Sequence, residues 1–170
     1  MRVFLAIVLL AFPALSALAA EMNLTVEIPR LQVAEYHRPY VAVWIEGEQH
    51  EVAAQLALWY DQANRKEDGA KWLKDLRQWW RRGGRELALP VDGVTGATRP
   101  AGQQQLRLQS GQPPLGELKA GSYTLVVEAA REVGGREVLK LPFTWPVSAP
   151  LHVEAQGQHE LGRIALDINP

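Results

Sequence analysis

The chain has 170 residues, a formal net charge of −1 and no cysteine. The lack of cysteine excludes a disulfide framework, a thiol nucleophile and a cysteine-linked lipid anchor. The nearly balanced charge offers no general basic field, so nucleic acid is not expected as a partner.

The first residues have the pattern of a secretory signal peptide. Arg2 precedes an apolar run from Val3 to Leu15, and Ala17-Leu18-Ala19 supplies an A-x-A cleavage pattern. The run is too short to span a bilayer. We therefore expect residues 1–19 to be cleaved on export, and residues 20–170 to form a single domain that is peripheral to a membrane at most.

Strand patterns dominate the first part of this domain. Residues 22–28 alternate apolar and polar side chains, which predicts a half-buried strand that ends at Pro29. Residues 39–45 are apolar on both faces, as in a strand buried on two sides. Residues 51–60 are expected to complete a hairpin around Gly47, with a helix as the alternative for this segment.

A tryptophan-rich stretch at about residues 70–82 predicts an amphipathic α-helix. Apolar side chains recur at the spacing of one helix face, namely Trp72, Leu73, Leu76, Trp79 and Trp80. Asp68 can cap its start, and Gly83-Gly84 can end it. The stripe suits burial against a sheet, and one of its edges could instead supply an aromatic wall for a flat ring. Eight basic and three acidic residues between 65 and 85 suit a solvated face, a phosphate or an acidic partner.

The second half of the chain again reads as strands. Residues 123–133 and 136–145 flank Gly134-Gly135, which predicts a hairpin with a two-residue turn. That register sets Glu132 opposite Glu137, so either the turn is longer or nearby arginines shield the pair. The hairpin's charged side chains are expected to form a solvated face; they are Glu128, Arg131, Glu132 and Arg136. A last hairpin is expected around Gly157. The whole pattern predicts an all-β, immunoglobulin-like β-sandwich with one inserted amphipathic α-helix.

The least ordinary stretch is a small-residue loop at residues 90–102, between the predicted helix and the next strand. Its glycines allow backbone angles that other residues rarely adopt, and its alanine adds little bulk. The Thr98 hydroxyl could therefore be presented to a large binding partner. The alternative is a pair of tight turns in which Thr98 is only a cap. The order Asp-x-x-Thr-Gly-Ala-Thr, from Asp92 to Thr98, resembles the acceptor motif of extracytoplasmic flavin transferases. These enzymes join FMN through a phosphoester to the last Thr or Ser.

The resemblance implies an FMN site with no catalytic residue of its own. Thr98 would be the attachment point, and a flavin transferase would recognise Asp92, Thr95, Gly96 and Ala97. Trp79 and Trp80 would contact the flavin ring. The hypothesis requires an exposed Thr98 in a loop free of sheet pairing. It also requires a surface aromatic near Thr98, drawn from a set that comprises Tyr60, Trp72, Trp79 and Trp80.

Blocks along nearly the whole mature chain resemble the predicted periplasmic domain-of-unknown-function family 2271. They are residues 38–44, 56–60, 72–73 with 79–81, 92–100 and 128–132. The resemblance implies a periplasmic redox context with PepSY-type membrane proteins and flavin transferases. The leading hypothesis is thus an exported electron carrier with covalent FMN, rather than a hydrolase or transferase. The alternatives are a non-enzymatic immunoglobulin-like module that docks a membrane redox partner, and a sugar-binding sandwich suggested by six tryptophans.

The four histidines do not have the spacing of a zinc motif, so no metal ligands are assigned.

Overall fold

A computed structural model of the chain describes residues 20–62 and 69–170. The predicted signal peptide, the predicted helix cap Asp68 and the first charges of the basic run lie outside these residues.

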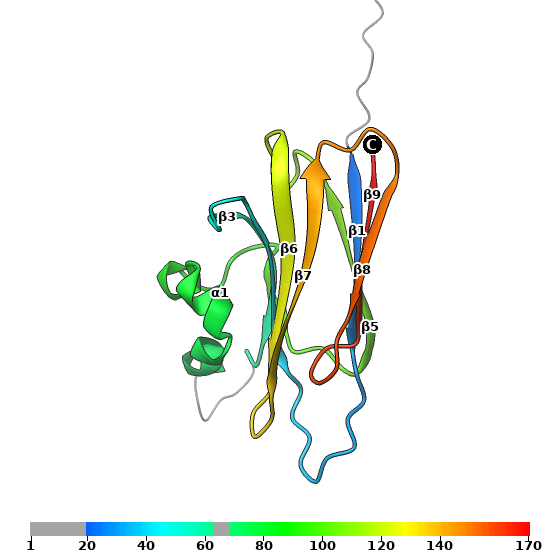
Figure 1. The fold of residues 1–170 in the computed structure, drawn as a ribbon. Helices are drawn as coiled ribbons and strands as arrows, with labels where there is room; N and C mark the ends of the chain where they lie inside the picture. The colour runs from blue at the N-terminus through cyan, green and yellow to red at the C-terminus, as the bar shows by residue number, and fades with distance from the viewer. Residues whose placement is uncertain (1–19, 63–68) are drawn as a thin grey trace, which may run out of the picture.

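Two sheets pack face to face (Figure 1). The four-stranded sheet has the order β5-β1-β9-β8, and the five-stranded sheet the order β4-β3-β2-β6-β7. The strands are β1 (Glu21–Ile28), β2 (Tyr40–Glu46), β3 (Val52–Tyr60), β4 (Thr95–Ala97), β5 (Gly102–Gln109), β6 (Gly121–Ala130), β7 (Arg136–Trp145), β8 (Leu151–Gln156) and β9 (Arg163–Asn169). The predicted all-β sandwich is confirmed, and so is the strand assignment of residues 51–60 over the helical alternative.

The main core lies between the two sheets. In β1 every second side chain is buried, so Met22, Leu24, Val26 and Ile28 all face inward. They meet inward side chains of β2, β6 and β9 in one continuous cluster. Each such fully buried aliphatic side chain contributes about 1.5–3 kcal/mol relative to exposure. The alternating sequence pattern therefore sets which face of each strand is covered.

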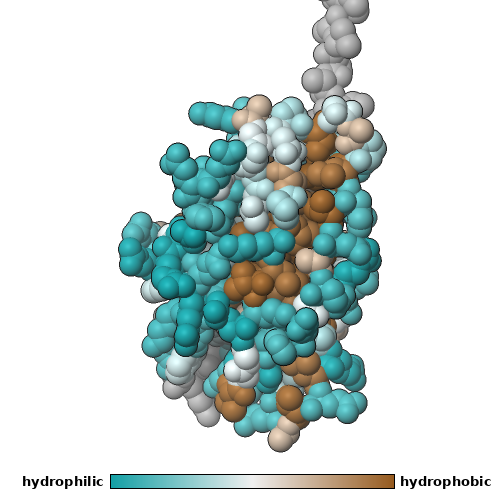
Figure 2. Space-filling view, in the orientation of Figure 1, coloured by the Kyte–Doolittle hydropathy of each residue, from teal (hydrophilic) through white to brown (hydrophobic). Residues whose placement is uncertain are grey.

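The sandwich is less well covered along the side that carries β7 and β8. Figure 2 shows a band of hydrophobic side chains there, between the two sheets. On β7 and β8, several hydrophobic side chains that pack against the core are only partly buried. They are Leu139, Leu151, Val153 and Ala155.

A helical cap, Gly69–Glu86, covers the outer face of the five-stranded sheet (Figure 1). It consists of the 3-10 segment η1 (Gly69–Asp75), the short α-helix α1 (Arg77–Arg81) and the 3-10 turn η2 (Gly84–Glu86). The prediction of one continuous helix at about 70–82 is therefore wrong in detail. The fully buried large side chains are Leu73, Leu76 and Trp79, spaced by three, and a 3-10 turn stacks side chains at that spacing. No helix in the described residues is long and apolar enough to cross a membrane.

A second core forms beneath the cap, separate from the first. It joins the cap to outward side chains of β2 and β3, with Trp44 and Trp79 its largest fully buried members. Glu128 on β6 is also fully buried and accepts hydrogen bonds from the Gln78 and Trp79 amides at 3.0 and 2.7 Å. Arg136 Nη1 donates to the same carboxylate at 2.8 Å. Glu128 thus fixes the start of α1 to the sheet.

The β6–β7 turn also departs from the prediction. Strand pairing ends at Ala130 and Arg136, so the turn comprises residues 131–135 rather than Gly134-Gly135 alone. The longer turn removes Glu132 from the position opposite Glu137. The expectation of a solvated charged face is wrong for Glu128 and for Arg131, because the Arg131 side chain is buried against Glu160. A buried carboxylate needs such partners to offset the loss of hydration.

Candidate functional site

A hydrogen-bonded turn precedes β4 and sets the position of the acceptor-like motif. The Thr95 hydroxyl accepts from the Val91 amide at 2.6 Å and donates to the Val91 carbonyl oxygen. Backbone bonds from Val94 and Thr95 to the same carbonyl close the turn. Gly93 has φ +72° within it, a conformation that other residues adopt at a cost. Thr95 therefore has a structural role as a clamp on this turn.

The motif itself is partly a strand, which corrects the prediction that it is free of sheet pairing. Residues Thr95–Ala97 form β4 and pair in parallel with β3, with Gly96 beside Trp59. Gly96 does not need a positive φ. The Arg99 guanidinium lies 5.3 Å from the centroid of the Trp59 ring. Sheet pairing on one side of Thr98 and a cation–π contact on the other hold the motif in place.

Thr98 follows β4 at the sheet end where several strands begin or stop. Because β4 is parallel to β3, Thr98 and Asp61 leave their strands at the same end. At this end β2 begins with Tyr40, which pairs with the last residue of β6, Ala130. The topology thus brings Thr98 beside the start of β2 and the β6–β7 turn, which are distant from it in sequence.

A cavity of about 530 Å³ lies at this end of the sheet, and Thr98 is part of its wall. Its other walls are the β1–β2 connection, the helical cap and the β6–β7 turn. The lining residues are Tyr36, His37, Arg38, Tyr40, Asp61, Trp72, Asp75, Thr98, Ala130, Arg131, Glu132 and Val133. Thr98 is half-buried, and its hydroxyl has no hydrogen bond to any residue in the described ranges. The cavity volume is in the range of ligand sites, about 300–1,000 Å³.

Aromatic rings line part of this cavity. Trp72 is 40% exposed and projects from the cap, and Tyr36 is 39% exposed in the β1–β2 connection. Tyr40 lies deeper, where its ring makes an edge contact with Tyr60 at 6.2 Å between centroids. Burial raises the pKa of the Tyr40 phenol; the Asp61 and Glu132 carboxylates add to this, and a backbone hydrogen bond at Asp61 opposes it. The phenol therefore stays protonated at neutral pH, and it donates to the Gly69 carbonyl oxygen at 3.2 Å.

The charged side chains of the cavity are mostly arranged in pairs. His37 lies 2.9 Å from Glu35 and 3.6 Å from Glu132, which connects the β1–β2 segment to the β6–β7 turn. Arg131 donates to both oxygens of Glu160, at 2.8 and 3.0 Å. These pairs fix the walls at places where no regular secondary structure does so.

Two of the predicted ring contacts are not at this cavity. Trp79 is fully buried in the second core, and its indole N–H donates to Gln55 at 2.9 Å. Trp80 is half-buried against the same core and does not line the cavity. Of the four aromatic residues considered from sequence, Trp72 is the one that lines the cavity together with Thr98. Asp92 and Ala97 are exposed, the former in the turn before β4 and the latter at the end of that strand.

The sequence analysis missed the contribution of the β1–β2 connection. Tyr36, His37 and Arg38 line the cavity although they precede Thr98 by some sixty positions. Residues 38–44 carry the family resemblance and residues 39–45 predict a strand, but neither pattern indicates a site, and Tyr36 has no local signal. Their proximity to Thr98 comes from the antiparallel pairing of β2 with β3.

The chemistry available at the cavity is that of a half-buried threonine hydroxyl in a wall that also carries aromatic rings. In the part of the chain that the structure describes, the Thr98 hydroxyl makes no hydrogen bond to a histidine. The described residues also hold no group of three or more His, Cys, Asp or Glu that could bind a metal ion.

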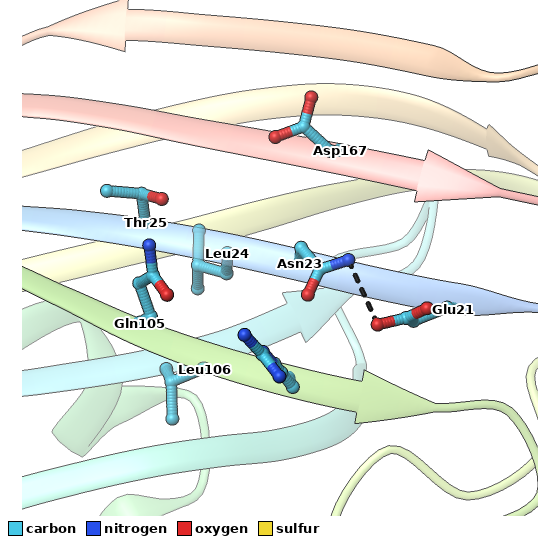
Figure 3. Close-up of a pocket in the computed structure, with 8 residues that line it drawn as sticks. Glu21, Asn23, Leu24, Thr25, Gln105, Leu106 and Asp167 are labelled. Atoms are coloured by element: carbon cyan, nitrogen blue, oxygen red, sulfur yellow. Dashed lines mark hydrogen bonds between the residues drawn. The ribbon is translucent and has the colours of Figure 1, made fainter.

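A second hollow, of about 340 Å³, lies on the outer face of the four-stranded sheet (Figure 3). Side chains from β1, β5 and β9 surround it, among them Asn23, Thr25, Gln105 and Asp167. Asn23 donates to Glu21 at 3.2 Å. This open, polar hollow contains none of the residues singled out from sequence.

The comparisons agree with the family resemblance and add no individual relative. The family described as predicted periplasmic protein, DUF2271, matches residues 21–163. No curated protein and no solved structure matches the chain. Since the match covers most of the chain, from β1 through β8 with the cap and the Thr98 motif, this chain belongs to the DUF2271 family of predicted periplasmic proteins.

Proposed function

We propose that this protein is a periplasmic electron carrier with FMN joined to Thr98 by a phosphoester, and that it exchanges electrons with a PepSY-type membrane protein. One observation carries the proposal: the last residue of the acceptor-like motif is a half-buried threonine in the wall of a cavity with exposed aromatic rings. A motif match by chance would not require Thr98 to lie at a cavity.

The attachment needs an activated flavin donor and a separate enzyme. The phosphorus of free FMN carries no good leaving group. In flavin adenine dinucleotide the same phosphorus is joined to AMP through an anhydride, so AMP can leave. The Thr98 oxygen attacks that phosphorus, a P–O bond of the pyrophosphate breaks, and AMP leaves. The flavin transferase would supply the general base that takes the hydroxyl proton. Neither the flavin nor the protein is oxidised or reduced in this step.

Part of the cavity wall suits the group, and Asp61, Asp75 and Glu132 add negative charge to the same wall. The volume of about 530 Å³ lies within the range of small-molecule sites. Trp72 and Tyr36 supply apolar surface for a flat ring, and Arg38 brings a cation to the same wall. When bound, FMN supplies one- and two-electron transfer; the chain supplies the tether and the surroundings that set its potential.

The test is intact-mass measurement after co-expression with a flavin transferase. We expect the wild-type mass to rise by one FMN and Thr98→Ala to remain unmodified. Thr144→Ala, an exposed threonine on β7, is the matched control and should be modified like wild type. An unmodified wild-type chain beside a second substrate that the same transferase does modify would end the proposal.

The alternative is a cofactor-free module that docks a membrane redox partner. The exposed apolar side chains around the cavity favour it, because such side chains often mark binding surfaces. In that case colourless protein would co-purify with the membrane protein, and Thr98→Ala would leave co-purification unchanged.

A further inference from the structure

Exposed apolar side chains concentrate around the Thr98 cavity. Four large hydrophobic residues are exposed in residues 20–62 and 69–170: Val33, Tyr36, Trp72 and Val133. Three of them line the cavity, and Val33 lies in the same β1–β2 connection as Tyr36. They come from three segments that are far apart in sequence. Local composition therefore does not explain their presence at one place.

Val133 is the most unusual of these residues. It lies in the β6–β7 turn with φ +53°, and its side chain is 79% exposed. A β-branched residue in the left-handed region is strained, and the neighbouring Gly134 could adopt such a φ without that strain. Exposure means that packing within the chain does not compensate. The strain presents an apolar side chain at the cavity, as is common where a ligand is later covered.

Trp72 is held in place although its ring is open to solvent. The ammonium groups of Lys71 and Lys74 lie 4.9 and 5.7 Å from the centroid of its ring. The residue that follows it, Leu73, is fully buried in the second core. The backbone under Trp72 is thus anchored, and cation–π contacts restrain the indole. A restrained aromatic surface loses less entropy when a flat ring stacks on it.

We infer that the cavity is the binding pocket of the flavin ring, with Trp72 and Tyr36 in contact with the isoalloxazine and Val133 covering its edge. This inference rests on the proposed attachment at Thr98 and goes beyond it, because a tethered flavin could equally extend into solvent. Figure 1 shows the β1–β2 connection and the β6–β7 turn at the same end of the sandwich, so the two segments can contact one group.

Flavin fluorescence of the FMN-loaded protein tests the inference. A flavin in contact with Trp or Tyr is quenched, because the aromatic ring gives an electron to the excited flavin and then recovers it. We expect the wild-type protein to be quenched several-fold relative to free FMN. Trp72→Leu and Tyr36→Leu should each recover part of the fluorescence, and the double variant most of it. Both side chains are more than a third exposed, so neither variant should prevent folding.

The matched control is Tyr123→Leu, which removes a partly exposed tyrosine that stacks on Phe143 instead. It should leave the flavin as quenched as in wild type. Intact mass and circular dichroism of every variant establish attachment and folding. Attached flavin that is as bright as free FMN, or that the double variant fails to brighten, overturns the ring pocket and leaves the attachment standing. A wild-type chain that is never modified overturns both.

Discussion

Glu137 is a single carboxylate that organises the β8–β9 turn from another sheet. Its two oxygens accept hydrogen bonds from four consecutive backbone amides, those of residues 158–161, at 2.7–3.0 Å. Burial raises the pKa of Glu137, but the four amide bonds outweigh burial and hold it below its ordinary value of 4.5. The charged form is therefore the one that stabilises the fold.

Replacing Glu137 should destabilise the protein in a pH-dependent way. We expect Glu137→Gln to lower the free energy of unfolding by about 1.5–3 kcal/mol at pH 7, the usual value of hydrogen bonds to a charged group. Because the folded pKa is depressed, the wild-type advantage is complete above the unfolded pKa and is lost as pH falls through the folded pKa. Urea unfolding across acidic and neutral pH measures the difference. A gap between the two proteins that persisted at the lowest pH would contradict this account.

The control is Glu117→Gln, since Glu117 is exposed and makes no hydrogen bond with the described residues. It should have little effect at any pH.

Contacts of this kind explain what sequence reasoning could not find at single residues. Glu128 and Glu137 lie on the same hairpin, and a solvated position was predicted for Glu128. Both bind backbone amides of segments more than twenty positions away. Backbone amides carry no sequence signal, so the partners become visible only in the folded chain. Thr98 was identified because the acceptor motif is local, whereas Tyr36 was missed because its proximity to Thr98 is entirely tertiary.

At the scale of elements, the sequence pattern predicted the strands, whereas it predicted the helical cap only in part. Alternation over β1 and the turn at Gly47 depend on nearest neighbours, and both were predicted. In the cap, Leu76 with ψ +71° interrupts the helix. An α-helix would place Trp72 and Trp80 on the buried side, and the 3-10 start instead leaves Trp72 at the cavity. The contacts of the cap with β2, β3 and Glu128 impose this geometry, and these partners lie outside the segment.

The cap should come loose without Glu128. We expect Glu128→Ala to destabilise it by about 1–3 kcal/mol for each buried amide left without an acceptor. Hydrogen exchange of the amides in residues 77–81 should accelerate, while amides of the main core should change little because the two cores are separate.

Arg136→Ala is the comparison for this variant. The Arg136 side chain is 38% exposed, so solvent screens its ion pair with Glu128. Its loss should therefore have a smaller effect on the cap. Equal acceleration in the two variants would show that the ion pair, rather than the amide bonds, holds the cap.

On the scale of the whole molecule, the first and last strands share a sheet. β1 is an inner strand with β5 on one side and β9 on the other, and Glu21 pairs with Asn169. β8 has β9 as its partner. Removal of residues 157–170 therefore takes a neighbour from β1 and leaves β8 without a partner. We expect the shortened chain not to fold, as judged by circular dichroism. Removal of Pro170 alone, which lies outside β9, should have no such effect.

The pairing of β1 with β9 also has a kinetic consequence. Bringing such distant segments together costs loop-closure entropy before any stabilising contact between them forms. Sandwiches with many non-local strand pairs therefore fold in about milliseconds to seconds. If a chain crossed a membrane with its N-terminus first, β1 would reach the far side before the other strands. Its sheet neighbour β9 would arrive after them. The sheet cannot be completed while β9 is still behind the barrier. In a chain exported in this way, the topology would delay completion of the four-stranded sheet until β9 has crossed.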